Sequence, residues 1–476
     1  MTLTSIPRSG ATAHTRPRLV LIATSLGVLF AQIDTSVVNL ALKSIASDLH
    51  TGVSAMQWVI DSYNLVYASL LLTGGTLGDL FGRRRIFILG IALFIAGTLI
   101  CALAPNAEIL IAGRAVSGLG AAFEVAMSLV LLAGAFPDRK ERAHALGVWA
   151  SCNGIAFIIG PTVGGWLVDS IGWRSIFYVI LPVCAAAWLL TLYGVAESSD
   201  PKGRKLDLPG QALAILGLSA FAFAAIEGSR WGWTSPMILT IAGAAIIALA
   251  LFVWVEARTP GPLLPLTFLR RPPFSAALAC AGLMTFGMYA LLFLMPLYFQ
   301  SVRGASPLIA GFELLPMSAS FVAVSQYVGH LNNRFGPRVV MTAGMICMGA
   351  GALALAFIGE ATLLVVVELA LFVVGIGLGL NTAPVNGVAV AALPPERSGT
   401  ASGLVNTARM VGATLGVAIL GALFAAYAGQ DAAAGANFLP GLKAAMIGGG
   451  TSELIGAVVA FAFVRHDSLK PKGSKA

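Results

Sequence analysis

Charged residues are scarce in this chain. Only 11% of its 476 residues are Asp, Glu, Lys or Arg, and 58% are hydrophobic, whereas a soluble globular protein carries about 25% charged residues. No soluble core needs so much apolar sequence, so the composition excludes a soluble protein and predicts a membrane-embedded one. The first apolar segment, 19–42, is too long for the apolar region of a secretory signal peptide and lacks a small-residue cleavage site. We therefore expect it to be retained as a membrane span.

Cysteine and histidine are also few, with five of each. The cysteines are scattered through apolar stretches without a C-x-x-C pair, which argues against a disulfide framework and against a metal site. We find no histidine cluster, nucleophile elbow or phosphate-binding loop; the glycine run 375–380 lacks the strand–turn–helix context of a nucleotide site. The sequence therefore predicts no enzyme, no cofactor and no metal.

Long apolar runs make up most of what is present. A membrane-spanning helix needs about 20 mostly apolar residues, and a window of that length predicts fourteen spans. They are 19–42, 55–78, 85–104, 108–136, 143–170, 173–196, 206–227, 236–256, 272–300, 309–331, 337–358, 361–391, 399–428 and 442–465. We expect an all-α polytopic membrane protein with fourteen transmembrane helices.

Lys and Arg are divided unequally between the two sets of loops. The N-terminus, the loops after even-numbered spans and the C-terminal tail hold 22 of the 29 basic residues, and the opposite loops hold five. Because short loops rich in Lys and Arg stay cytoplasmic, both termini of this multi-pass protein are expected in the cytoplasm. The net charge of +8 follows from this asymmetry and gives no reason to expect nucleic-acid binding.

The sequence contains an internal repeat. GTLGDLFGRRR (75–85) recurs as GHLNNRFGPRV (329–339), with Gly, Leu, Phe, Gly and Arg at the same spacing, and 136–143 weakly resembles 393–400. Two parallel six-span halves that bind substrate near the midplane describe one class of secondary transporter. The predicted domains are a cytoplasmic tail (1–18), an N-terminal six-helix bundle (19–200), an inserted transmembrane hairpin with its linkers (201–260), a C-terminal six-helix bundle (261–465) and a second cytoplasmic tail (466–476).

Four motifs then carry a family resemblance. They are Asp34, Thr35, Val37, Asn39, Ala41 and Leu42 in the first span; Gly75, Leu77, Asp79, Gly82, Arg83 and Arg84 after the second; Arg114, Gly118 and Gly120 in the fourth; and Gly160, Pro161, Gly164 and Gly165 in the fifth. With them the chain resembles the major facilitator superfamily over nearly its whole length, and within it the fourteen-span drug:proton antiporters of the EmrB/QacA type. The resemblance implies proton-coupled efflux of drugs or antibiotic-like molecules across the cell inner membrane by alternating access.

The chain departs from the family pattern at several positions. Lys43 stands where proline is usual, Leu80 where arginine is usual, Ser117 where glutamine is common and Ala156 where glycine is usual. These differences bear on the identity of the substrate more than on the fold.

An aspartate, Asp34, interrupts the apolar first span. A charge near the bilayer centre costs at least about 2.5–3.5 kcal/mol, so such residues are usually functional. Arg114 lies in the fourth span, which neighbours the first in this fold, and a buried arginine needs an acceptor. The pair is either static, or Asp34 exchanges protons as its exposure changes while Arg114 tunes its pKa. We count both residues among the proton-coupling candidates.

Further acids lie in or near the spans. Glu124, about three turns from Arg114 on the same helix face, is not part of the family pattern; it either exchanges a proton for a cationic or polar drug group or is a protonated, hydrogen-bonded packing residue. Asp61, near the start of the second span, is either an entry-side proton relay or solvated. Glu124 and Asp61 complete the proton-coupling candidates, while Glu368 and Glu453 are expected in structural roles at the periphery.

Two glycine-rich motifs are predicted to control conformation. In the 75–85 turn, glycines permit close helix approach, and Asp79 either latches onto a helix N-terminus or an arginine of the facing bundle, or belongs to a charged turn that only fixes topology. In 160–165, a kinking proline and three glycines permit tight packing; the antiporter resemblance implies restricted leakage, and an ordinary helix contact is the alternative. The gating candidates are Gly75, Asp79, Gly82, Arg83 and Arg84, and the antiporter-motif candidates are Gly160, Pro161, Gly164 and Gly165.

A drug cavity requires adaptable side chains, which aromatic and thioether groups provide through packing and cation–π contacts. The cavity candidates are Glu124, Tyr63, Phe123, Trp149, Met284, Met288, Tyr289, Phe293, Asn406 and Arg409. The expected partners are a drug-like small molecule, protons and the lipid bilayer, and a periplasmic adaptor is left open. The alternative function is a facilitator-fold transporter of a specific metabolite such as a sugar, an organic acid or a siderophore.

Overall fold

The computed structural model describes residues 16–200, 206–259, 262–394, 397–429 and 437–464. Most of the two predicted tails, the basic segment 202–205 and part of the 393–400 stretch lie outside these ranges. All regular secondary structure in the described residues is helical.

The first half of the chain folds into six long helices. They are α1 (Pro17–Asp48), α2 (Val53–Phe81), α3 (Arg83–Leu103), α4 (Ala107–Ala135), α5 (Arg139–Ser170) and α6 (Ser175–Gly194). Local sequence sets their ends: the Asn106 side chain accepts a hydrogen bond from the backbone of Ile109 at 2.9 Å and caps α4, and the Asp138 side chain caps α5 in the same way. Gly82, at φ 112°, turns the chain from α2 directly into α3.

The remaining helices follow in a similar order. They are α7 (Leu208–Trp231), α8 (Pro236–Glu256), α9 (Leu266–Leu269), α10 (Pro272–Ser301), α11 (Pro307–Glu313), α12 (Leu315–Leu355), α13 (Leu364–Ala392), α14 (Ser398–Ala428) and α15 (Phe438–Phe463). Within α12 the helix is broken at Gly336, which has φ 77° and ψ 157°. Gly336 holds the repeat position of Gly82, so both repeats turn at a glycine in the left-handed region, where other residues are strained.

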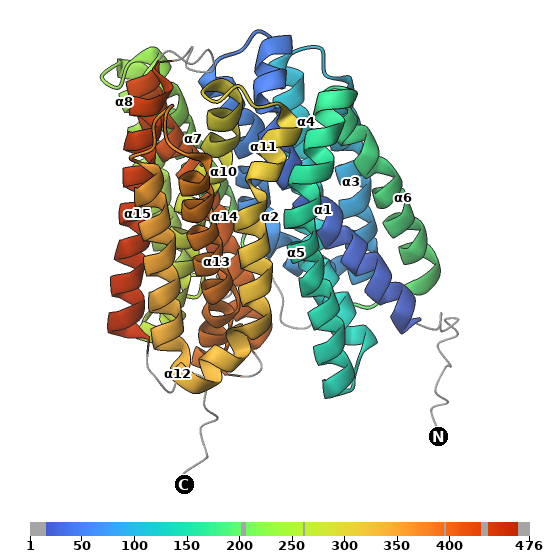
Figure 1. Ribbon diagram of the computed structural model, residues 1–476. Helices are drawn as coiled ribbons and strands as arrows, with labels where there is room; N and C mark the ends of the chain where they lie inside the picture. Colours follow the sequence, from blue (N-terminus) through green and yellow to red (C-terminus); the bar gives the residue numbers. More distant parts are fainter. Residues whose placement is uncertain (1–15, 201–205, 260–261, 395–396, 430–436, 465–476) are drawn as a thin grey trace, which may run out of the picture.

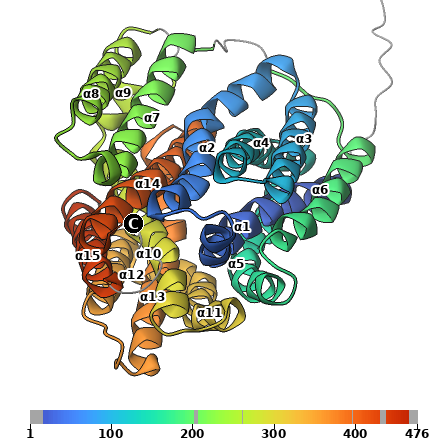
Figure 2. The same cartoon turned by 90° about the horizontal axis from the view of Figure 1, so that it is seen from above.

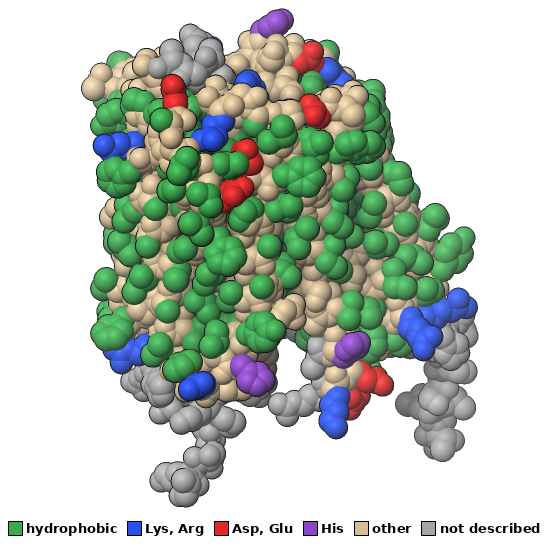
Figure 3. All heavy atoms as spheres, in the orientation of Figure 1, with side chains coloured by type: hydrophobic (Ala, Val, Ile, Leu, Met, Phe, Trp, Pro, Cys, Tyr) green, Lys and Arg blue, Asp and Glu red, His purple; other side chains and the backbone are tan. Residues whose placement is uncertain are grey.

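The helices have the lengths and surfaces of membrane spans. Twelve stretches of the described residues are long and apolar enough to cross a membrane; α2 is not among them, and Pro307–Leu355 counts as a single stretch. Figure 3 shows hydrophobic side chains over most of the middle of the molecule, with charged side chains mostly near its two ends. The chain is therefore an all-helical polytopic membrane protein, and the predicted count of fourteen spans stays a prediction.

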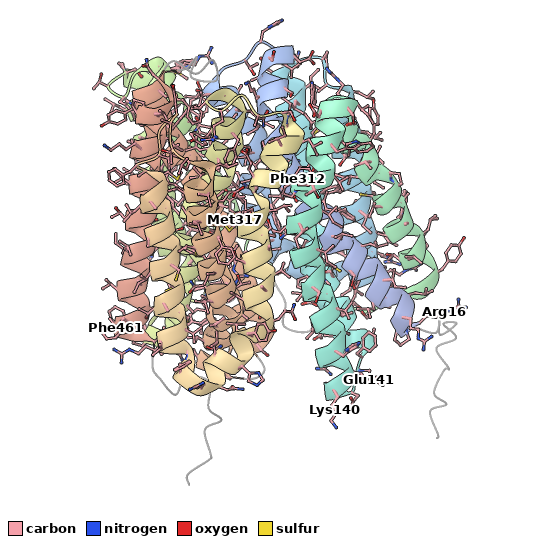
Figure 4. All side chains as sticks on the ribbon, in the orientation of Figure 1. Arg16, Lys140, Glu141, Phe312, Met317 and Phe461 are labelled. Carbon is pink, nitrogen blue, oxygen red and sulfur yellow. The ribbon has the colours of Figure 1, made fainter. Side chains whose placement is uncertain are left out.

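The helices form two groups with a pair of helices beside them. Figures 1 and 2 show α1–α6 on one side and α10–α15 on the other. The two groups meet through α2 with α14, α5 with α11, and α1 with α10. We call the end of the bundle that carries Arg16 and Phe461 the terminal face, and the opposite end the far face (Figure 4). At the terminal face the two groups are separated by a notch (Figure 3).

The α7–α8 pair lies beside the seam between the groups (Figure 2). Polar contacts at two places fix α7 to α2. The Gln211 side chain donates to the carbonyl oxygen of Ser69 at 2.6 Å and accepts a hydrogen bond from the Thr73 hydroxyl group, and the Trp58 indole donates to Glu227 at 3.0 Å. Near the second contact, Ile226 packs against α14. One helix of the pair therefore touches both groups.

Candidate functional site

The structure brings Asp34 and Arg114 together inside the N-terminal group. Nη1 of Arg114 lies 2.5 Å from Oδ2 of Asp34, and the two side chains are 2% and 1% exposed. Nε of Arg114 donates to the carbonyl oxygen of Val59 at 3.0 Å, and its guanidinium lies 4.5 Å from the ring centre of Tyr63. Tyr63, predicted to line the cavity, therefore packs on this ion pair. The pairing is confirmed, and its role in proton coupling stays a prediction.

Glycines of the fourth span make this geometry possible. A Cβ on Gly118 would overlap the backbone of Tyr63 on α2, and a Cβ on Gly120 would overlap the backbone of Phe94 on α3. The helix α4 therefore lies so close to both neighbours that neither position has room for a side chain. Small residues permit such close packing in membrane bundles. Arg114, one turn from Gly118, thereby reaches α2 as well as α1.

Glu124 lies on the same helix as Arg114 but in a different environment. Its side chain is 0% exposed, and neither carboxylate oxygen has a hydrogen-bond partner within the described residues. The carboxylate lies against Gly27 of α1, where a Cβ would overlap it. Glu124 is thus a buried, unpaired acid in this conformation, and its contact with substrate stays a prediction.

Two acids are more buried than the sequence suggested. Asp61 is 0% exposed and neither of its oxygens has a hydrogen-bond partner in the described part of the chain, so the alternative of a solvated Asp61 is wrong. The first turns of α2 are covered from two sides, because Gln57 donates to Val417 of α14 and the carbonyl oxygen of Val59 accepts from Arg114 of α4. Glu453, expected at the periphery, is 1% exposed because its carboxylate packs against Gly287 of α10, which has no side chain to exclude it.

The gating motif is held within its own half. Nε and Nη2 of Arg83 donate to Oδ1 of Asp79 at 3.0 and 2.9 Å. The Glu197 carboxylate, after α6, accepts the backbone N–H groups of Arg84 and Arg85 at 3.1 and 3.2 Å, and so caps the start of α3. Sequence reasoning missed Glu197; the signal was an acid directly after the sixth span, on the same side as the basic turn.

Gly75 does not serve close helix packing in this conformation. A Cβ built on it would meet no atom within 4 Å, so the packing expectation is wrong for this residue. The neighbouring Gly78 does fit that expectation, because a Cβ there would overlap the side chain of Met127.

The antiporter motif packs α5 between two helices. A Cβ on Gly160 would overlap α1, and one on Gly164 would lie 2.7 Å from the side chain of Val37, also on α1. A Cβ on Gly165 would lie 2.6 Å from the carbonyl oxygen of Pro307 at the start of α11. The carbonyl group of Pro161 is likewise covered by α11. The tight packing predicted for this motif is present, and its effect on leakage stays a prediction.

Hydrogen bonds join the two groups at the far face. Nζ of Lys43 donates to the carbonyl oxygen of Gln300 at 2.6 Å, and Nε2 of Gln300 donates to that of Leu40 at 3.0 Å. Nε2 of Gln57 donates to the carbonyl oxygen of Val417 at 2.9 Å. A hollow of about 600 Å³, lined in part by Lys43 and Gln300, opens beside these contacts. Sequence reasoning missed both glutamines, although Lys43 in place of proline was a signal.

The cavity candidates divide by exposure. Phe123, Met284, Met288, Tyr289 and Phe293 are buried, whereas Trp149, Asn406 and Arg409 are partly exposed. Toward the far face the groups are in contact, with the rings of Phe157 and Phe321 5.6 Å apart between α5 and α12. The partly exposed candidates are therefore the ones placed to meet a solute in this conformation.

Comparisons with known proteins place the chain in a family. The Major Facilitator Superfamily profile matches residues 24–417. The chain is 42% identical over 410 residues to the multidrug resistance protein Stp of Mycobacterium tuberculosis, covering 86% of this chain and 76% of that one. It is 35% identical over 427 residues to the methylenomycin A resistance protein of Streptomyces coelicolor, covering 90% of each.

Solved structures agree on the fold. The peptide transporter POT in complex with sulfate has a TM-score of 0.69 at 15% identity, covering 96% of each chain. A bacterial homolog of the human lysosomal transporter Spinster, solved inward-facing and unoccupied, has a TM-score of 0.65 at 18% identity, covering 94% of this chain and 97% of that one. At these identities the likeness concerns the fold alone. From the family match and its relatives, this chain belongs to the Major Facilitator Superfamily.

Proposed function

We propose that this chain is a transporter that exports drugs or antibiotic-like small molecules across the cell membrane in exchange for protons. The observation that carries the proton coupling is the buried Asp34–Arg114 pair in a protein whose two groups part at one face. A titratable acid in such a place can change its exposure when the groups rock. Drug efflux is supported by relatives named as multidrug resistance and antibiotic resistance proteins, which also support a transporter rather than an enzyme.

The topology belongs to the same proposal. Adding α2 to the twelve candidates, and dividing α12 at Gly336, gives fourteen spans of the EmrB/QacA type. The bundles are 19–200 and 261–465, with the hairpin in 201–260 between them. The distribution of Lys and Arg supports cytoplasmic termini. The terminal face is then cytoplasmic, and the described conformation faces inward.

In this mechanism the far-face contacts keep the outer side closed while Asp34 holds Arg114. Protonation of Asp34 removes the anion beside Arg114 and leaves the guanidinium with the Val59 carbonyl oxygen and the Tyr63 ring. The free energy of the pair therefore depends on the protonation state of Asp34, which allows protons to bias the two conformations. Asp61 and Glu124, buried without a hydrogen-bond partner among the described residues, are the other proton-coupling candidates.

Flux through the purified protein in liposomes tests the proposal. A pH gradient of one unit is worth about 1.4 kcal/mol per proton, and 100 mV adds about 2.3 kcal/mol. One proton thus sustains a gradient of several hundred-fold for a neutral solute. We expect uphill drug movement when the gradient is imposed and its loss with an uncoupler. Flux that ignores both gradient and potential would refute the antiport.

The metabolite-transporter alternative predicts a different substrate range. A specific transporter prefers one solute, whereas a drug exporter is inhibited competitively by several chemically unrelated drugs. Competition measured in the same liposomes therefore distinguishes the two.

A further inference from the structure

Arg409 is a cation near the seam between the two groups, and only some of its N–H groups have hydrogen-bond partners. It lies in the middle part of α14, the helix that packs against α2 of the other group. Nη2 donates to the carbonyl oxygen of Thr382 on α13 at 2.8 Å, and Nη1 lies 3.5 Å from Oδ1 of Asn406 on its own helix. Nε is buried and has no hydrogen-bond partner among the described residues.

No carboxylate pairs with Arg409 in the described part of the chain, which sets it apart from Arg114. A guanidinium removed from water without an anion is costly, and arginine presents its donors in a planar fork that matches a carboxylate. The partly exposed Arg409 side chain therefore offers an unfilled site for an acceptor.

Two tyrosines lie on helices of opposite groups that pack against α14. On α10, the hydroxyl group of Thr285, one turn before Tyr289, donates to the backbone carbonyl oxygen of Arg409 at 2.6 Å. Tyr67 lies on α2, which also packs against α14. Tyr67 is partly exposed. Neither tyrosine was predicted from the sequence to lie near Arg409. Aromatic rings favour flat aromatic ligands through stacked or edge-to-face contacts. The surroundings of Arg409 thus combine one positive charge with aromatic surface contributed by both groups.

We propose that Arg409 binds the ionised acidic group, such as a carboxylate, of an aromatic substrate whose ring packs against Tyr67 and Tyr289. This inference rests on the proposed export of drug-like molecules and names a substrate class for it. The guanidinium N–H groups that are not used by Thr382 and Asn406 donate to the anionic oxygens, because charge-assisted bidentate contacts are the strong ones. Binding at the seam also places the ligand where both groups contact it.

Equilibrium binding to the purified full-length protein in detergent tests the proposal. The probes are fluorescent anthracene carboxylate and the matching anthracene carboxamide, which differ in charge but hardly in shape. We expect the wild type to bind the carboxylate at least about tenfold more tightly, which corresponds to about 1.4 kcal/mol. Arg409→Gln should reduce that preference to less than twofold, and Arg409→Lys should retain part of it.

Arg271→Gln is the matched control. Arg271 also donates to a backbone carbonyl oxygen, that of Ala392 at 2.7 Å, but it is exposed at the start of α10. Its replacement removes one positive charge and one such hydrogen bond, and the preference for the carboxylate should survive.

A wild type that binds the two probes equally would overturn the inference without any variant, as would a full preference retained by Arg409→Gln. These measurements use no gradient. A failure of proton coupling in liposomes therefore leaves the binding result intact, and the two proposals can fail separately.

Discussion

Replacing Asp34 by asparagine keeps the shape of the side chain and removes its charge. Arg114 is then left with the carbonyl oxygen of Val59 at 3.0 Å and the ring of Tyr63 at 4.5 Å, but with no anion. Removing one partner of a buried ion pair costs about 3–5 kcal/mol. We expect Asp34→Asn to insert in the membrane, to lose stability of that order, and to lose uphill export while downhill movement of drug continues.

A second variant separates structure from coupling. Arg114→Gln should be destabilised to a similar degree, because Asp34 then lacks its cation. In the double variant neither charge is buried, so thermal unfolding in detergent should return close to that of the wild type. If the pair is static, the double variant should regain uphill export together with its thermal stability. A proton-carrying Asp34 predicts that stability returns while export stays downhill only.

Two results would refute this reasoning. Uphill export at the wild-type rate by Asp34→Asn, measured in liposomes with an imposed pH gradient, would remove Asp34 from the coupling mechanism. A double variant as unstable as the less stable single variant would instead show that the two charges do not compensate each other.

Three further changes test other contacts. Lys43→Met removes the 2.6 Å hydrogen bond to Gln300, so hydrogen exchange at the far-face ends of α1 and α10 should accelerate several-fold; unchanged exchange would count against a latch. Gly165→Ala places a methyl group 2.6 Å from the carbonyl oxygen of Pro307, which should loosen α5 from α11 and raise proton leak into liposomes loaded with a pH dye; equally tight liposomes would contradict the sealing role. Glu124→Gln should weaken export of cationic dyes more than that of neutral drugs, whereas equal losses would assign Glu124 to packing.

The sequence was most informative where a residue was costly in an apolar setting. Asp34 and Arg114 stand in apolar spans, and because each charge needs a partner, their pairing could be predicted without coordinates. The helix break at Gly82 and its repeat at Gly336 could be predicted for a similar reason, since each glycine ends a span and enters a basic turn.

What the sequence could not reveal depends on residues distant in the chain. Glu453 is buried because α10 offers a glycine at the matching height, and no pattern within α15 indicates this. Glu197 caps α3 from beyond α6, a contact that requires the folded arrangement of three helices. From the sequence, Lys43 is recognisable only as a departure from the usual proline. The group that accepts its hydrogen bond, the carbonyl oxygen of Gln300, belongs to the other half of the chain.

Because α7 lies on one side of the bundle, the two flanks of the protein present different surfaces to the surrounding lipid. Beside α7, the seam between α2 and α14 is covered, so lipid on that flank contacts α7 in place of the seam. On the opposite flank, α5 exposes the side chains of Val148, Ile155 and Ile159 and parts from α12 toward the terminal face (Figure 1). The described helices therefore present two different flanks to the surrounding lipid, one covered by α7 and one along which α5 and α12 diverge.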